Sequence, residues 1–200
     1  MRGGEASYGK KIFDVGDNAL VAFAGLTGIR DDFLLLIKHE VAKVRPKSLY
    51  ELKIAVEDTV FQLAERYKGR LEPGFENVHA LLAGLEGLSS GKANLYQVLG
   101  GYGEQVDSIC IGHGAEHAVT LFKFLYSPAL PVADLALLAA FTIYWVGEDL
   151  DTVVGGSPDV FMLSNDARKI SKLDSKATNQ MKAKAVEMRE NLRGSVLDRR

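Results

Sequence analysis

The stretch ICIGHGAEHAV, residues Ile109–Val119, admits two interpretations that lead to different kinds of protein. His113, Glu116 and His117 have the H-x-x-E-H spacing of inverted zinc peptidases, which need both histidines on one helical face. The same stretch is also an apolar strand that passes through two glycines, one on each side of His113, into a helical pattern. Glycine tolerates positive φ and close backbone approach, so these glycines favour a strand-to-helix turn. We therefore expect no metal here and keep the zinc site as an alternative hypothesis.

The composition is typical of one soluble, intracellular domain. At 200 residues the chain is long enough for one well-buried core. The formal net charge of −2 gives no basic footprint for nucleic acid and no polybasic patch for a membrane. Cys110 is the single cysteine, so an internal disulfide is impossible and a reducing compartment, the cytoplasm, is expected. Its apolar surroundings favour a buried structural thiol over a nucleophile. No sequence feature indicates a cofactor.

Apolar runs predict strands, and helical spacing of apolar residues predicts helices. The expected strands cover residues 10–15, 19–26, 78–85, 93–99 and 106–112, with a final hairpin over 158–164 and 168–173. The expected helices cover residues 27–45, 49–67, 116–126, 133–148 and about 175–193. Ser48 and Glu51 form a capping box before the second helix, and Pro128 and Pro131 separate the third helix from the fourth.

The order of these elements predicts the fold class. Strands joined by short turns pair in antiparallel fashion, and two separate helix pairs suit the two outer faces of stacked sheets. We therefore expect an α+β fold, a four-layer αββα sandwich of two antiparallel sheets. Residues 1–200 are expected to form a single domain, with a core over about 10–173 and the terminal helix packed beside it.

Four motifs and their order resemble the proteasome core-particle subunits, particularly the β type. The motifs are KKIF (10–13), DNALVAFAGL (17–26), ALLAGLEG (80–87) and DTVVGGSPDVFML (151–163), with the Gly-x-Gly turn between the last two. The resemblance covers about Lys10 to Leu173 and implies the fold of N-terminal nucleophile hydrolases, which is the αββα sandwich. It also implies threonine-type peptidase chemistry, in which an N-terminal threonine attacks the peptide with help from its own α-amino group.

The resemblance also implies which residues support that chemistry. By position, Lys11 matches the family lysine that lowers the proton affinity near the nucleophile, and Asp151 matches an aspartate of the catalytic network. Ala115 and Val154 stand where the family commonly has serines. Residues 1–200 do not include the family's nucleophilic threonine or its first strand hairpin, so we expect the natural gene to start upstream of Met1. Whether this protein is an enzyme is left open.

Several functional hypotheses follow from these observations. The first is a β-type-like subunit of a ring-shaped, cytoplasmic protein-degradation complex, non-catalytic in residues 1–200 by themselves. Its expected partners are other proteasome-type subunits and unfolded polypeptide substrates, with no nucleic acid and no membrane. The alternatives are an active threonine endopeptidase with an upstream nucleophile, a zinc-dependent hydrolase that uses His113, Glu116 and His117, and a stand-alone binding module that has lost both the chemistry and the rings.

Overall fold

The chain divides into two compact units in its computed structural model. The structure describes residues 10–16, 18–70, 78–86, 92–150, 154, 158–164 and 169–197. The first unit, here called the sheet unit, comprises Gly9–Gly112 and Leu163–Ser171. The second, here called the helical unit, comprises Met1–Tyr8, His113–Met162 and Lys172–Arg200. The single domain expected from the sequence stays a prediction.

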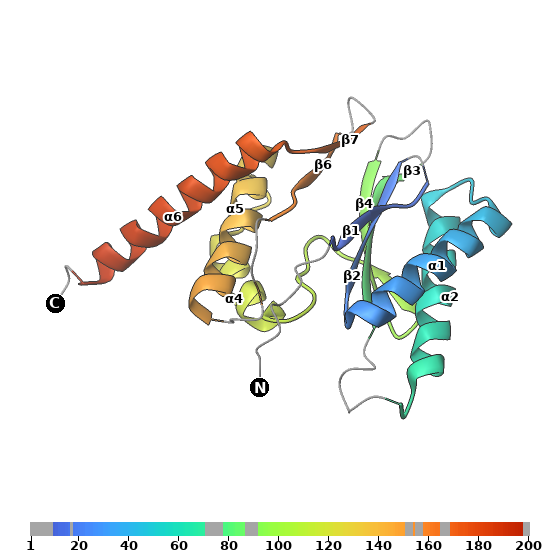
Figure 1. Cartoon of the computed structure of the whole chain (residues 1–200). Coiled ribbons are helices and arrows are strands. Elements are labelled where there is room, and N and C mark those ends of the chain that lie inside the picture. Colours follow the sequence, from blue (N-terminus) through green and yellow to red (C-terminus); the bar gives the residue numbers. More distant parts are fainter. Residues whose placement is uncertain are drawn as a thin grey trace. The chain divides into compact units, whose positions relative to one another are not determined.

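An antiparallel meander of five strands forms the centre of the sheet unit, and consecutive strands are neighbours throughout (Figure 1). The strands are β1 (Ile12–Asp14), β2 (Ala19–Ala24), β3 (His79–Glu86), β4 (Lys92–Leu99) and β5 (Tyr102–Gln105). β3 is the central strand and pairs with β4 from His79 to Glu86. The strands expected over 19–26, 78–85 and 93–99 are therefore present, each shifted by only one or two residues at its ends.

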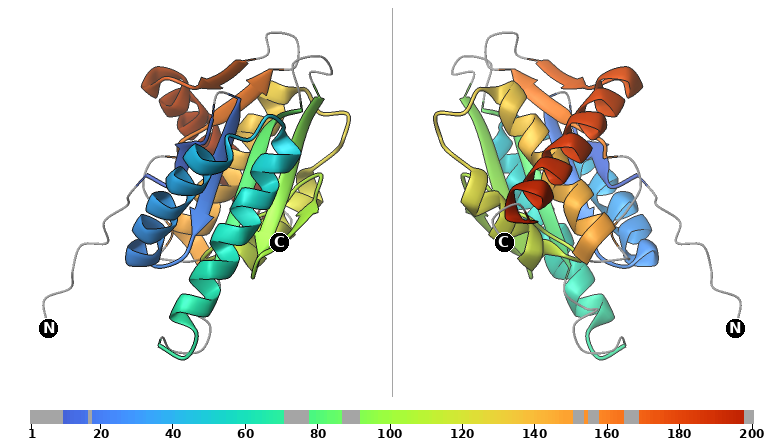
Figure 2. Two further views of the ribbon diagram at one scale, coloured as in Figure 1. Left: turned by 90° about the vertical axis from the view of Figure 1, so that its right-hand side faces the viewer. Right: turned by 90° about the vertical axis from the view of Figure 1, so that its left-hand side faces the viewer.

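A helix pair covers one face of this sheet (Figure 2). α1 (Thr27–Val44) and α2 (Leu49–Tyr67) connect β2 to β3. Because side chains alternate along a strand, every second residue of β2, β3 and β4 faces the helices. The fully buried hydrophobic side chains of this core are Val21, Phe33, Ile37, Val56, Val60, Leu63, Val78, Ala80, Leu82 and Val98. The core stabilises the sheet unit mainly by removing this apolar surface from water.

The ends of α1 and α2 are fixed by polar contacts. The Ser48 hydroxyl accepts a hydrogen bond from the Glu51 amide at 3.1 Å, which confirms the predicted cap. The Glu51 carboxylate accepts from the amide of Lys47 at 2.6 Å, one residue before the cap residue itself. At the far end of α2, the Tyr67 hydroxyl donates to Asp32 at 2.6 Å and so joins α2 to α1. This hydrogen bond raises the pKa of Tyr67.

The strand expected over residues 106–112 is wrong, and its place is taken by β5. Gly100 and Gly101 adopt positive φ values of 59° and 90°, so the chain reverses directly after β4. The outward-facing amide of Gly103 then donates to the carboxylate of Glu57 in α2 at 2.6 Å. After the amide of Val106 donates to Leu95, the backbone leaves the sheet. The sequence hid this turn because Gly100–Gly103 contains three glycines and reads as a loop.

Three helices and a π-turn form most of the helical unit. They are α4 (Ala115–Leu125), α5 (Val132–Trp145), the π-turn η1 (Val146–Leu150) and α6 (Ser175–Leu197). Leu138 and Phe141 of α5 pack with Ala185 of α6 in a core to which Tyr144 and Trp145 also contribute. The Phe141 and Trp145 rings meet edge to face, with 5.1 Å between their centroids, so the tryptophan contributes to the packing of this core.

The final hairpin completes the described elements. β6 (Phe161–Ser164) and β7 (Lys169–Lys172) pair as a separate two-stranded sheet. With two antiparallel sheets and helices in both units, the predicted α+β class is confirmed. Among the described residues, no helix combines the length and apolar character that a membrane span requires.

Gly84 of β3 lies against Leu49 of α2, and this position gives a test of the packing. A Cβ at Gly84 would lie 2.5 Å from a Leu49 methyl and 3.0 Å from the carbonyl oxygen of Asn18. We expect Gly84→Ala to lower the free energy of unfolding by about 1–3 kcal/mol through overpacking. Urea unfolding measures this change.

Gly28→Ala in α1 is the matched control, because a Cβ at this position meets nothing within 4 Å. This substitution should raise the free energy of unfolding by up to about 1 kcal/mol. Equal effects of the two variants would contradict the packing.

Candidate functional site

The turn before α4 is built by two glycines, as the sequence predicted. Gly112 and Gly114 have φ values of 96° and 71°, in the region that favours glycine. Gly114 is the residue before the first turn of α4, and its carbonyl accepts from the Ala118 amide at 3.0 Å. His113 therefore lies outside the helix that carries Glu116 and His117. The helical face that a zinc H-x-x-E-H site needs is absent, and no group of three potential ligands was found in the described part of the chain.

Cys110 lies just before this turn and is half-buried. Burial raises the pKa of its thiol. A raised pKa lowers the fraction of thiolate, which is the nucleophilic form. Cys110 is thus a poor nucleophile, as expected, although the segment that carries it is not a strand.

Lys11 immediately precedes β1 and is held through its backbone. Its carbonyl accepts a hydrogen bond from the amide of Phe23 in β2 at 3.0 Å. The preceding carbonyl, that of Lys10, accepts from the Arg30 guanidinium of α1 at 3.4 Å. The Lys11 side chain is exposed, and none of the described acidic side chains pairs with it. The fold therefore fixes the backbone of Lys11, and the exposed side chain leaves its ammonium group accessible.

Three small residues, Ala24, Gly25 and Gly112, lie at the same end of the sheet as Lys11. Gly25 follows β2 with a φ of 155°, and a Cβ there would lie 2.9 Å from the Phe23 ring. A Cβ at Gly112 would lie 3.2 Å from the Cβ of Ala24. Ala24, at the end of β2, thus contacts Gly112 of the glycine turn. Ala24 is also next to Phe23, whose amide donates to Lys11. We call this group of Lys11, Ala24, Gly25 and Gly112 the β2 end.

His79, which the sequence did not single out, is a neighbour of the β2 end. It pairs directly with Ala24 across the β2–β3 ladder and with Leu99 across the β3–β4 ladder. It is half-buried, and burial lowers the pKa of its imidazole below the ordinary value of 6.5. The ring is therefore neutral near pH 7. Its place could be found only from the register of β2 with β3, which are separated in sequence by two helices.

Asp151, the second predicted site residue, lies outside the described residues. The chain on both sides of it is described. Before it, Asp149 of η1 pairs with Arg189 of α6 at 3.6 Å. After it, the carbonyl of Val154 lies so close to Gly147 that a Cβ there would be 2.7 Å away. Lys11 belongs to the sheet unit and Asp151 to the helical unit, and their catalytic roles stay a prediction.

Comparison with known proteins identifies the class. Residues 5–160 match the sequence model of the family described as "Proteasome subunit". This chain therefore belongs to the proteasome subunit family, as the sequence motifs indicated. The fold agrees with that of two solved structures. One is Anbu (ancestral beta-subunit) from Yersinia bercovieri, at a TM-score of 0.72 and 15% identity over 94% of this chain and 84% of that one.

The second similar structure is the Anbu (Gly-1) mutant from Hyphomicrobium sp. strain MC1. It aligns with a TM-score of 0.71 and 15% identity over 92% of this chain and 83% of that chain. At this identity the likeness establishes a shared fold and carries no activity across. The protein is thus a proteasome-family subunit with the fold of the ancestral beta-subunit structures.

The buried position of His79 predicts a pH dependence of stability. Because its pKa is lower in the folded chain than the unfolded value of about 6.5, the unfolded chain binds more protons below that value. Its contribution to stability is therefore complete above pH 6.5 and decreases as the pH falls towards the folded pKa. We expect His79→Gln to flatten the urea-midpoint curve between pH 7 and pH 5. His39→Gln, which removes an exposed histidine, is the matched control. An equal flattening of the curve in both variants, or no flattening in either, would contradict a lowered pKa of His79 in the folded chain.

Arg189 predicts how firmly η1 is held in the helical unit. It pairs with Asp149, and its guanidinium lies 5.3 Å from the centre of the Tyr144 ring. We expect Arg189→Met to lower the free energy of unfolding by about 1 kcal/mol through loss of both contacts. Hydrogen exchange of residues 146–150 should rise together with this loss. Lys184→Met, at an exposed position of α6, is the control and should leave both measurements unchanged.

Proposed function

We propose that this protein is a subunit of a ring-shaped, cytoplasmic protein-degradation assembly whose partners are other proteasome-type subunits. The observation that carries the proposal is the family match over residues 5–160. The shared fold, which extends over 94% of the chain, supports it. In such an assembly each subunit forms part of a chamber wall, and unfolded polypeptide is the substrate.

Residues 1–200 by themselves are proposed to be without peptidase activity. The resemblance places serines of the family's catalytic network at two positions where this chain has Ala115 and Val154. Neither side chain can donate or accept the hydrogen bonds of a hydroxyl. Ala115 is the first residue of α4, and Val154 is half-buried against Gly147. Both positions therefore contribute packing in place of a hydroxyl.

The alternative within the same class is an active threonine-type endopeptidase. In that case a nucleophilic threonine is exposed by processing of a chain that starts upstream of Met1. Lys11 is then the cation that lowers the proton affinity of the nucleophile, because a nearby positive charge favours the ionised form of an acid. Its exposed ammonium group at the β2 end suits this role. Asp151 is proposed to order the network.

A zinc-dependent hydrolase is not retained. His113 precedes α4, so the three residues of the H-x-x-E-H spacing do not share a helical face. A stand-alone binding module is distinguished from a ring subunit by native mass, since a ring member has a mass many times that of the 21.8 kDa chain.

Two measurements on the protein from its native cells test the proposal. Native mass spectrometry should detect an assembly of hundreds of kilodaltons that contains this chain, and N-terminal sequencing should show no processed threonine. A lone chain at all concentrations would overturn the proposed role. A mature N-terminal threonine would instead establish the active alternative.

If that threonine is found, Lys11 can be tested directly against its neighbour. We expect Lys11→Ala to lower cleavage of an unfolded protein substrate by at least about 100-fold, in the range for loss of one group that aids a nucleophile. Lys10→Ala is the matched control, because Lys10 is also exposed and its ammonium group lies over the Phe13 ring at 5.4 Å. Equal losses in both variants would exclude a specific role for Lys11.

A further inference from the structure

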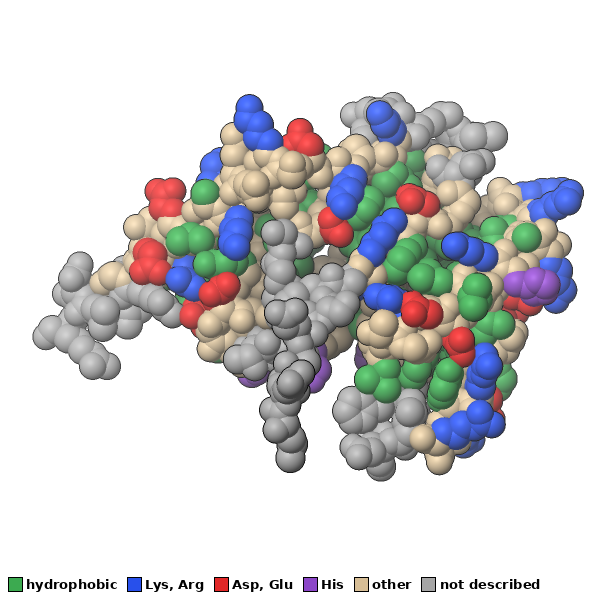
Figure 3. Space-filling model, in the orientation of Figure 1, with side chains coloured by type: hydrophobic (Ala, Val, Ile, Leu, Met, Phe, Trp, Pro, Cys, Tyr) green, Lys and Arg blue, Asp and Glu red, His purple; other side chains and the backbone are tan. Residues whose placement is uncertain are grey.

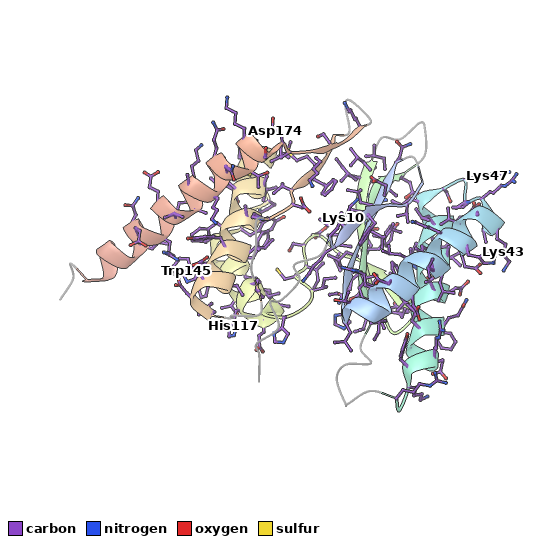
Figure 4. All side chains as sticks on the ribbon, viewed as in Figure 1. Lys10, Lys43, Lys47, His117, Trp145 and Asp174 are labelled. Carbon is purple, nitrogen blue, oxygen red and sulfur yellow. The ribbon has the colours of Figure 1, made fainter. Side chains whose placement is uncertain are left out.

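The corner between α1 and α2 has an exposed basic surface. Lys43, Arg45 and Lys47 lie within five residues, all exposed, and residues 43–50 contain no acidic side chain. Figure 4 shows Lys43 and Lys47 directed away from the helices at this corner, and Figure 3 shows basic side chains at the same place. Val44 and Tyr50, which are 52% and 57% exposed, add apolar surface. We call these five residues the basic corner.

Arg45 has a backbone conformation that its residue type disfavours. It ends α1 in the left-handed region, at φ 50° and ψ 61°, where glycine is the usual residue. It is also followed by Pro46, which steers the preceding residue towards extended conformations. Among the described residues, no other non-glycine residue has a positive φ. The amide of Arg45 donates to the Val41 carbonyl and so closes the last turn of α1, which fixes the place of Arg45 at the corner.

The charges next to the basic corner are largely occupied. Glu40 pairs with Lys43 at 3.4 Å, and the Glu51 carboxylate accepts from the Lys47 amide. Lys38 and His39 are exposed on the same helix, α1. The side chains of Arg45 and Lys47 pair with no acidic group in the described part of the chain. An acidic surface with some apolar character would therefore complement this corner.

The end of α5 has that complementary character. The π-turn η1 contains Glu148 and Asp149 and no basic residue. Asp149 is held by Arg189, whereas Glu148 is exposed and Leu150 is 47% exposed. π-turns are rare and are often found at functional positions. Gly147 of this turn lies against the backbone of Val154, where a Cβ would be only 2.7 Å from the Val154 carbonyl oxygen. We call Glu148, Asp149 and Leu150 the acidic turn.

We propose that the basic corner of one subunit binds the acidic turn of a second copy of this chain. The contact joins two different surfaces, so it is head-to-tail and can close a ring or extend as a filament. Arg45 and Lys47 face Glu148, and Val44 and Tyr50 pack with Leu150. This proposal rests on the proposed role as an assembly subunit and specifies which surfaces meet.

Crosslinking tests the contact in the full chain. In a Cys110→Ala background, one preparation carries Val44→Cys and a second carries Leu150→Cys. After the two are mixed, a short bismaleimide should join one chain of each kind. Neither preparation by itself should give a crosslinked product. Leu35→Cys mixed with Leu150→Cys is the matched control, because Leu35 is 70% exposed on the same helix. Equal crosslinking from positions 35 and 44, or a 44-to-44 product as the main one, would overturn the proposal.

Charge reversal tests the electrostatic part independently of the cysteines. Arg45→Glu with Lys47→Glu should weaken assembly at least about tenfold, and Glu148→Lys in the second copy should restore it. Lys184→Glu, on α6, is the control and should have no effect. Raising the salt concentration should weaken the wild-type assembly in the same direction. An assembly that persists unchanged in the double reversal overturns this interface and leaves the proposed function standing. A wild-type chain that never assembles overturns both.

Discussion

The structure of the sheet unit depends on the close approach of α2 to the sheet. Three glycines permit it: a Cβ at Gly84 would meet Leu49, one at Gly101 would meet Phe61, and one at Gly103 would meet Glu57 and Lys53. The buried core lies between the helix and these strands. Because interiors are packed as densely as organic crystals, a displacement of α2 would open voids along three strands at once. The packing of α2 therefore holds the strands of the meander in position, and the meander in turn positions the residues of the β2 end.

The same contact protects the exposed edge of the sheet. β5 is an edge strand, and its outward amide at Gly103 would otherwise be available for pairing with another chain. The Glu57 carboxylate accepts a hydrogen bond from this amide, and Lys53 in turn pairs with Glu57 at 2.8 Å. Association through this edge is thus discouraged, whereas the α1–α2 corner and η1 remain exposed. The proposed contact between subunits would therefore use charged helix ends and leave this strand edge unpaired.

The position of the β2 end is set by the backbone of the sheet. Lys11 is placed by backbone hydrogen bonds to β2 and by Arg30 of α1, so its position is a consequence of the sheet and survives changes in side-chain chemistry elsewhere. Ala115 and Val154, which the resemblance places at two serine positions of the family, carry no hydroxyl group. A proteasome-family subunit can therefore retain its architecture while its chemistry varies, because the architecture depends on apolar packing and glycines.

By itself, the sequence determined most of the element types, the capped start of α2, the glycine turn before α4 and the family. These features can be read from the sequence because each depends on residue spacing or on a backbone conformation that favours one residue type. Tertiary structure alone decided that β5 lies at Tyr102–Gln105, that His79 pairs with Ala24, and that Arg189 leaves solvent to hold η1. Each of these involves residues far apart in the chain or a loop-like sequence, and their energies come from burial and pairing partners that no local pattern specifies.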